Sequence, residues 1–190
     1  MRIGLIAQPW WVNLAILVPV AAYFWWRRSS IAITISQLLL LGVFACAFGF
    51  LEATVVVYLR AASGLLPGYQ GTADMIRAVP SPEAIVIPPS LLTLEVFREA
   101  ATMVMLISVA LLAPVKAKGR VAVFLWAFAI WDLVYYASLW ATVRWPHSIR
   151  DSDILFLIPQ PWLAPVWFPL LVSALTLVAI LLGRANPTKA

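Results

Sequence analysis

The sequence predicts an all-α polytopic membrane protein, a bundle of five transmembrane helices with its N-terminus outside and its C-terminus in the cytoplasm. The composition predicts this fold class, because 64% of the 190 residues are apolar and only 11% are charged. Soluble domains contain about 25% charged residues, so lipid is the expected solvent of this chain. The apolar residues form long continuous runs, which predicts helices rather than the alternating strands of a membrane barrel.

Five apolar runs approach or exceed the roughly 20 residues that a helix needs to cross a bilayer. They cover about 9–26, 31–59, 90–113, 121–143 and 162–182, so that residues 1–190 form a single transmembrane domain. The first run ends in Arg27 and Arg28 rather than in a small-residue cleavage site, which favours a retained helix over a signal peptide. The third run follows two prolines that suit a helix start. Prolines at 159, 161, 165 and 169 predict irregular or kinked first turns in the fifth.

The basic residues orient the five predicted spans. One side receives seven basic residues and no acid, namely Arg27, Arg28, Lys116, Lys118, Arg120, Arg184 and Lys189. That side is cytoplasmic by the positive-inside rule, which predicts a multi-pass protein of a bacterial inner, or plasma, membrane. The opposite side carries both long loops, residues 60–89 and 144–160, and the sequence leaves open whether the first loop re-enters the membrane. The net charge of +5 thus reports orientation rather than binding to nucleic acid.

Charged side chains inside or at the edge of the predicted spans are the candidate functional residues: Glu52, Glu95, Arg98, Glu99 and Asp132. An ionisable group at the bilayer centre costs about 2.5–3.5 kcal/mol, so such groups are expected to face the protein interior or water. A helical rise of about 1.5 Å per residue places all four acids in the outer half of the bilayer. Helical spacing also puts Tyr136 one turn after Asp132 and Tyr135 three residues after it, so either phenol could donate a hydrogen bond to the carboxylate.

The leading hypothesis is an outward-opening cavity that binds a cation, metal or polar ligand or relays protons. Its predicted lining residues are Glu52, Glu95, Arg98, Glu99, Asp132 and Tyr136. A divalent cation is left open as a cofactor, with Glu52, Glu95, Glu99 and Asp132 as candidate ligands, because hard cations take oxygen ligands. The single histidine, His147, and the single cysteine, Cys46, predict neither a haem nor an iron–sulfur cluster.

Two other function classes stay open beside this hypothesis. The first is a non-catalytic subunit of a homo-oligomer or larger membrane complex. The second is a membrane enzyme that acts on a lipid-linked substrate, with a carboxylate as general base and Arg98 holding an anionic group. No motif identifies a catalytic residue, so whether the protein is an enzyme stays undecided.

Each candidate residue also has a purely structural interpretation. Glu95 and Glu99 suit the positive N-terminal end of a helix dipole. Glu52 or Asp132 can pair with Arg98 simply to fix the bundle, and a buried ion pair is weak support for function. We interpret His147, Asp151 and Asp153 as residues of an exposed loop. Cys46 is interpreted as a small apolar residue that fills space between helices. Around Glu52, a stripe of small residues recurs every four positions and predicts close approach of a second helix, namely Ala45, Gly49 and Ala53.

Three strings in the sequence carry a resemblance to a known family. They run from Leu94 to Thr102 (LEVFREAAT), from Trp131 to Tyr136 (WDLVYY) and from Asp153 to Pro159 (DILFLIP). Together they resemble an uncharacterised family of multi-pass bacterial membrane proteins with no assigned function. The likeness extends from about the second predicted helix to the fifth, and it implies the membrane fold without implying an activity.

Overall fold

The computed structural model describes residues 6–28, 31–62 and 89–184, and these residues are mostly helical. Most of the predicted outer loop 60–89 lies outside the described residues, and so does the question of its re-entry. The same holds for Lys189, one of the basic residues used for orientation, and for four charged residues of the opposite predicted side, namely Arg2, Asp74, Arg77 and Glu83.

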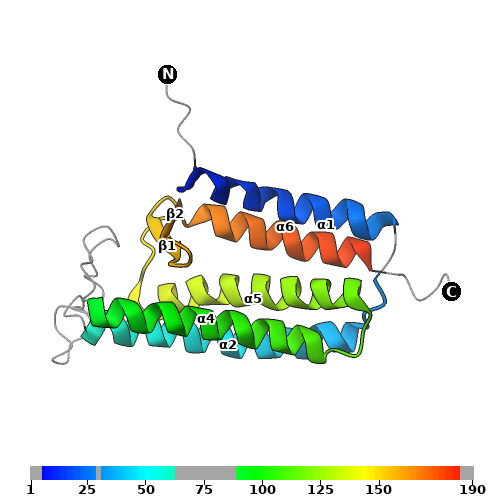
Figure 1. Ribbon diagram of the computed structural model, residues 1–190, viewed down its shortest axis with the longest axis horizontal. Coiled ribbons are helices and arrows are strands. Elements are labelled where there is room, and N and C mark those ends of the chain that lie inside the picture. The colour runs from blue at the N-terminus through cyan, green and yellow to red at the C-terminus, as the bar shows by residue number, and fades with distance from the viewer. Residues whose placement is uncertain (1–5, 29–30, 63–88, 185–190) are drawn as a thin grey trace, which may run out of the picture.

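The described residues form five α-helices: α1 (Leu17–Arg28), α2 (Ile35–Ala62), α4 (Pro89–Leu112), α5 (Ala117–Val143) and α6 (Trp167–Gly183). A 3₁₀ helix, η1 (Trp10–Ile16), leads into α1. Two of these helices, α2 and α5, are long and apolar enough to cross a membrane, whereas α6 is apolar but shorter. Successive helices along the chain run in opposite directions (Figure 1).

Helix α5 is the centre of the bundle, because it packs against α2, α4 and α6, while α1 packs on the outer side of α6. The most extensive packing between two helices lies between α2 and α5. Ala45 and Ala53 are buried there, and a Cβ atom added to Gly49 would come within 2.6 Å of the Trp131 carbonyl oxygen. The prediction that the small-residue stripe of α2 forms a packing face is therefore confirmed.

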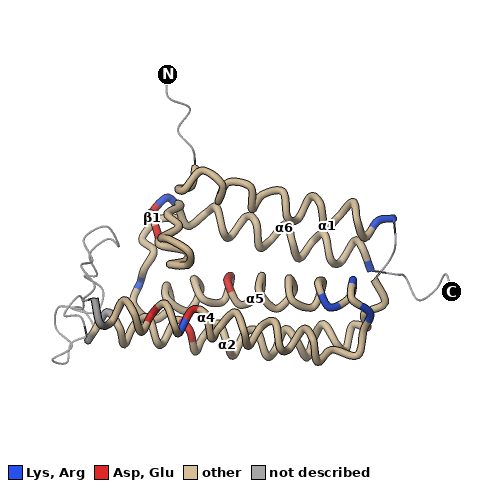
Figure 2. Tube along the Cα trace, viewed as in Figure 1, with Lys and Arg blue, Asp and Glu red and all other residues tan. Residues whose placement is uncertain are grey.

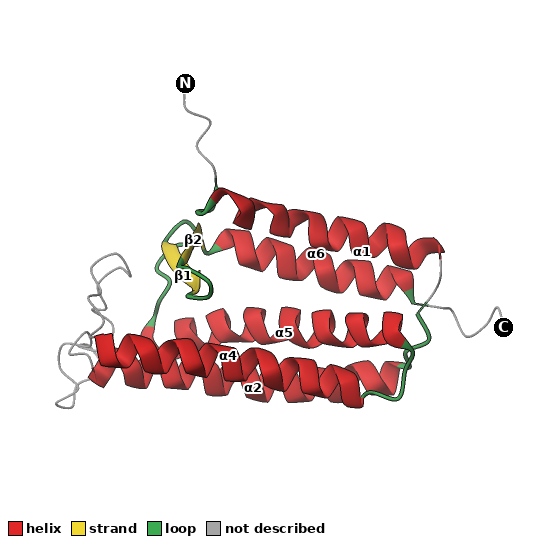
Figure 3. Ribbon diagram, viewed as in Figure 1, coloured by secondary structure: helices red, strands yellow, loops and turns green. Residues whose placement is uncertain are grey.

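A short β-hairpin departs from the all-α prediction (Figure 3). Strands β1 (Ser152–Phe156) and β2 (Trp162–Pro165) pair antiparallel, with Asp153 opposite Ala164. The predicted start of the fifth span near residue 162 is therefore wrong, and α6 begins only at Trp167. The physical reason is that the proline-rich stretch before this residue lacks several of the N–H groups that a helix needs, so this stretch forms the hairpin turn and its second strand.

Candidate functional site

A group of four side chains joins α2 to α4 and is called the clamp here: Glu52, Glu95, Arg98 and Thr102. The Arg98 guanidinium donates to the Glu52 carboxylate across the two helices, and its Nε donates to Glu95 Oε2 at 2.9 Å. Thr102 Oγ1 donates to Glu52 Oε1 at 2.6 Å. Both carboxylates are buried, at 5% and 6% exposure. The clamp thus contains its own cation, as expected for a group that stabilises the bundle.

Glu99, one residue after Arg98, makes a different connection. Its carboxylate accepts hydrogen bonds from the backbone N–H groups of Leu157 at 2.8 Å and Ile158 at 3.2 Å. These two amides follow strand β1, in the turn of the hairpin. A carboxylate that accepts from two amides forms charge-assisted hydrogen bonds, which are stronger than neutral ones. Glu99 therefore holds the hairpin turn against α4.

Asp132 lies in a third setting, between α5 and α6. It is buried, with 8% of its surface exposed, and Ser173 Oγ of α6 donates to its Oδ2 at 2.8 Å. Among the described residues, no Lys or Arg forms an ion pair with this carboxylate. Asp132 is thus a buried acid whose one hydrogen-bond donor is a neutral hydroxyl, unlike Glu52.

Tyr136 does not donate the hydrogen bond to Asp132 that the helical spacing allows. The Tyr136 hydroxyl donates instead to Asp153 Oδ2 of strand β1 at 2.7 Å. Asp153 is only 5% exposed, so its interpretation as a solvated loop residue is wrong, because the hairpin folds back against α5 and buries it. Asp153 lies close enough to Asp132 for the two carboxylates to interact electrostatically, which adds negative charge around Asp132.

The remaining loop residues match their sequence-based interpretation more closely. His147 is exposed, and its backbone N–H donates to Asp151 Oδ2 at 2.8 Å. Asp151 also accepts from the Ser148 N–H at 3.0 Å, so it caps the turn before the hairpin.

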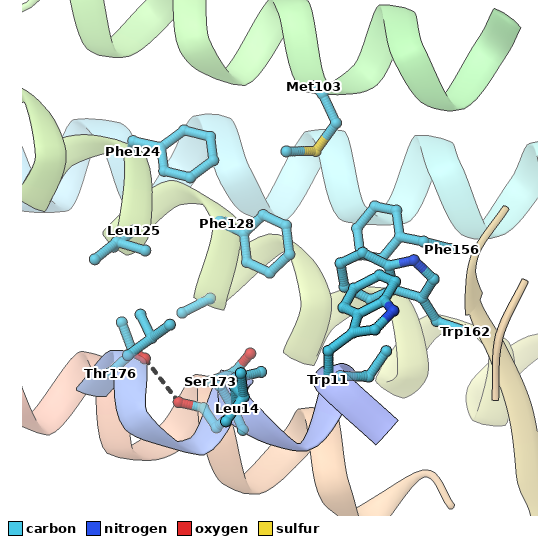
Figure 4. A pocket seen from close by; sticks show the side chains of 15 residues that line it. Trp11, Leu14, Met103, Phe124, Leu125, Phe128, Phe156, Trp162, Ser173 and Thr176 are labelled. Carbon is cyan, nitrogen blue, oxygen red and sulfur yellow. Dashed lines mark hydrogen bonds between the residues drawn. The ribbon is translucent and has the colours of Figure 1, made fainter. Parts of the chain in front are cut away.

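An apolar groove of about 450 Å³ lies beside Asp132 and is called the groove here (Figure 4). Its walls come from η1, α1, α4, α5, α6 and both strands. Five aromatic side chains contribute, namely Trp11, Phe124, Phe128, Phe156 and Trp162. Its hydroxyl groups belong to Ser173 and Thr176 of α6, and Ser173 is the residue that donates to Asp132. Because Leu14 and Val18 line the groove and are also exposed, the groove opens sideways at the surface of the bundle.

The structure therefore divides the six predicted site residues among several environments. It brings Glu52, Glu95 and Arg98 together and directs Glu99 to the hairpin. On α5, Asp132 contacts α6 through Ser173, and Tyr136 contacts strand β1 through Asp153. None of the six lines the groove. Within the described ranges, no group of three or more His, Cys, Asp or Glu side chains is placed to hold a metal ion.

Three polar residues of these groups were not singled out from the sequence as site candidates: Thr102, Asp153 and Ser173. Thr102 and Ser173 are hydroxyl residues in apolar runs, where a hydroxyl commonly forms a hydrogen bond across helices. Their position in the sequence was therefore a weak indication of such a role. The sequence contains no such indication for Asp153, since its burial depends on where the hairpin packs. Comparisons with known proteins add no assignment, because no protein-family model, curated protein or solved structure matches the chain.

Proposed function

We propose that this chain is a five-span membrane protein of the bacterial inner membrane that binds a cation at Asp132, beside the groove. Two features support the five spans. Successive helices alternate in direction, as consecutive membrane crossings must. Every helix carries large apolar side chains that are more than half exposed, among them Phe24, Leu40, Phe97, Trp140 and Leu182. Exposed apolar surface on this scale is typical of proteins surrounded by lipid.

The charge distribution supports the predicted orientation. Figure 2 shows only basic residues at the end of the bundle where α1 and α6 finish and α5 begins, whereas the described acids lie toward the hairpin end. The basic end includes Arg27, Arg28, Lys116 and Arg184. An excess of Lys and Arg marks the cytoplasmic side, which leaves the hairpin on the outside.

Cysteine labelling in intact cells tests this topology. Starting from a Cys46→Ala background, we expect Arg150→Cys, in the turn before the hairpin, to react with a membrane-impermeant thiol reagent. Lys116→Cys, at the start of α5, should react only after the cells are opened. Both residues are exposed, so neither result depends on burial. Labelling of Lys116→Cys alone in intact cells would show that the orientation is reversed.

The cation site rests on one observation, the absence of a basic partner for the buried carboxylate of Asp132 among the described residues. Within the membrane an ionised acid is costly unless a positive charge or several donors compensate it. Asp132 receives one hydroxyl donor from Ser173 and has a second acid, Asp153, in its neighbourhood. A bound cation would supply the missing charge. The clamp differs, because Arg98 is a cation of its own that pairs with both of its carboxylates.

Substitution of Asp132 by its neutral isostere tests the cation site. We expect the ligand-free Asp132→Asn protein to be more stable than the wild type by about 1 kcal/mol, because functional sites commonly sacrifice stability of that size. We further expect at least one class of cation to raise the thermal midpoint of the wild type, since a ligand that binds the folded state stabilises it. The variant should show no such rise.

The panel of cations should include sodium, potassium, magnesium, calcium and organic ammonium ions, each added to protein purified in a nonionic detergent. Asp151→Asn is the matched control, because it removes the same charge from a loop that lies away from the groove. Its response to cations should equal that of the wild type. If Asp132→Asn responds as strongly as the wild type, or if nothing in the panel stabilises either protein, the cation site is wrong.

A further inference from the structure

The surroundings of Asp132 indicate what kind of cation fits. Phe128 and Ala129 line the groove and precede Asp132 on α5 by four and three residues, so they share its side of the helix, about one turn away. From α6, Ser173 both lines the groove and donates to Asp132. The carboxylate is therefore next to the groove wall, to which the hydrogen bond from Ser173 connects it.

The groove itself suits an organic body rather than a hydrated ion. Its volume of about 450 Å³ falls in the range of pockets that hold drug-sized molecules, and such pockets are largely apolar with a few polar groups. None of its described lining residues is charged. A calcium or magnesium ion takes six or more ligands, mostly oxygen atoms, and the side chains of the groove offer two hydroxyl groups. Thr176 already donates its hydroxyl proton to the Val172 carbonyl at 2.7 Å.

The aromatic side chains make the groove attractive to positive charge. Trp11 and Trp162 meet edge to face with ring centroids 4.8 Å apart, and Phe156 lies 5.1 Å from Trp162. Figure 4 shows these rings together at the hairpin end of the groove. The faces of aromatic rings attract cations, and quaternary ammonium groups are the best-known ligands of such clusters. An anionic head is disfavoured by the nearby carboxylates of Asp132 and Asp153.

We propose that the groove binds an amphiphilic organic cation, with the apolar body of the ligand between α1, α5 and α6 and its positive charge directed toward Asp132. The exposed side chains of Leu14 and Val18 at the mouth give such a ligand a lateral route from the bilayer. This inference rests on the proposed cation site at Asp132 and adds the chemical class of its ligand.

Binding of radiolabelled tetraphenylphosphonium to protein in phosphatidylcholine nanodiscs tests the inference. We expect saturable binding to the wild type and at least about tenfold weaker binding to Asp132→Asn, a change that corresponds to about 1.4 kcal/mol. Leu14→Trp should weaken binding similarly, because it narrows the mouth of the groove without altering Asp132. Leu14 is exposed, so this variant is expected to fold. Asp151→Asn should bind as the wild type does.

Competition experiments separate this inference from the proposed function. Dodecyltrimethylammonium should displace the label, whereas dodecanol, with a chain of the same length and no charge, and sodium or calcium should not. If inorganic cations stabilise the protein through Asp132 but tetraphenylphosphonium does not bind, the ligand class is wrong and the cation site stands. If dodecanol competes equally, the groove binds apolar chains without regard to charge, which overturns the inference. Full binding to Asp132→Asn would overturn both.

Discussion

Replacement of Arg98 by methionine should destabilise the protein by about 3–5 kcal/mol, the range observed when one partner of a buried ion pair is removed. Methionine keeps much of the length and apolar character of the side chain, so the lost packing is small. What is lost is the one cation of the clamp. The carboxylates of Glu52 and Glu95 would then stay buried, and Glu52 would keep only its hydrogen bond from Thr102. Unfolding in detergent, followed by circular dichroism, measures the effect.

Two companion variants identify the cause. Thr102→Val removes one neutral donor to Glu52 and should cost only about 1 kcal/mol. A triple variant, Arg98→Met with Glu52→Gln and Glu95→Gln, removes the carboxylate charges together with the cation. It should recover a large part of the stability, because residues of one network are not additive. A loss below 1 kcal/mol for Arg98→Met alone would show that the clamp does not stabilise the bundle.

The clamp also separates two hypotheses that the sequence could not distinguish. Spacing placed Glu95, Arg98 and Glu99 on one side of a helix, but it gave no information on which acid of another helix Arg98 would meet. The structure pairs Arg98 with Glu52 and leaves Asp132 with Ser173. The structural interpretation thus fits Glu52, and the proposed cation site is Asp132. The sequence alone does not distinguish these two acids, because each is the single acid within a long apolar run.

The helices could be predicted because their residues form long, continuously apolar runs in the sequence. The predicted runs 90–113 and 121–143 end within a few residues of α4 and α5. The hairpin could not be predicted from the apolar pattern. Its strands are five and four residues long and flank a proline-containing turn, so a helical extension of the fifth run fitted the apolar pattern equally well. The same error hid Asp153, whose burial and bond to Tyr136 depend on the hairpin packing against α5.

The small-residue stripe of α2 gives a second strong prediction, which also links packing to the proposed site. Gly49→Ala should destabilise the protein by about 3 kcal/mol, at the upper end of the range for overpacking. The added Cβ would lie 2.6 Å from the carbonyl oxygen of Trp131 and 3.1 Å from Val134 Cβ. A backbone oxygen cannot turn aside as a flexible side chain can, so α2 and α5 must separate.

Gly42→Ala, on the same helix, is the matched control. A Cβ at this position would meet Ile130 Cδ1 at 3.5 Å and Trp126 Nε1 at 3.9 Å, which are ordinary contacts. Alanine should therefore be neutral here or stabilising by up to about 1 kcal/mol, the difference in helix propensity between the two residues. Equal stabilities for the two variants, measured by thermal unfolding in the same detergent, would contradict the close approach of α2 to α5.

The Gly49 variant has a consequence at the cation site, because Trp131 immediately precedes Asp132 on α5. A shift of α5 that relieves the contact at Gly49 would move the Asp132 carboxylate relative to Ser173 of α6, and their hydrogen bond is 2.8 Å long. Folded Gly49→Ala protein should therefore bind tetraphenylphosphonium more weakly than folded Gly42→Ala protein, although neither substitution touches the groove. Unchanged binding by Gly49→Ala would show that α2 moves alone and that the position of α5 is set by α6.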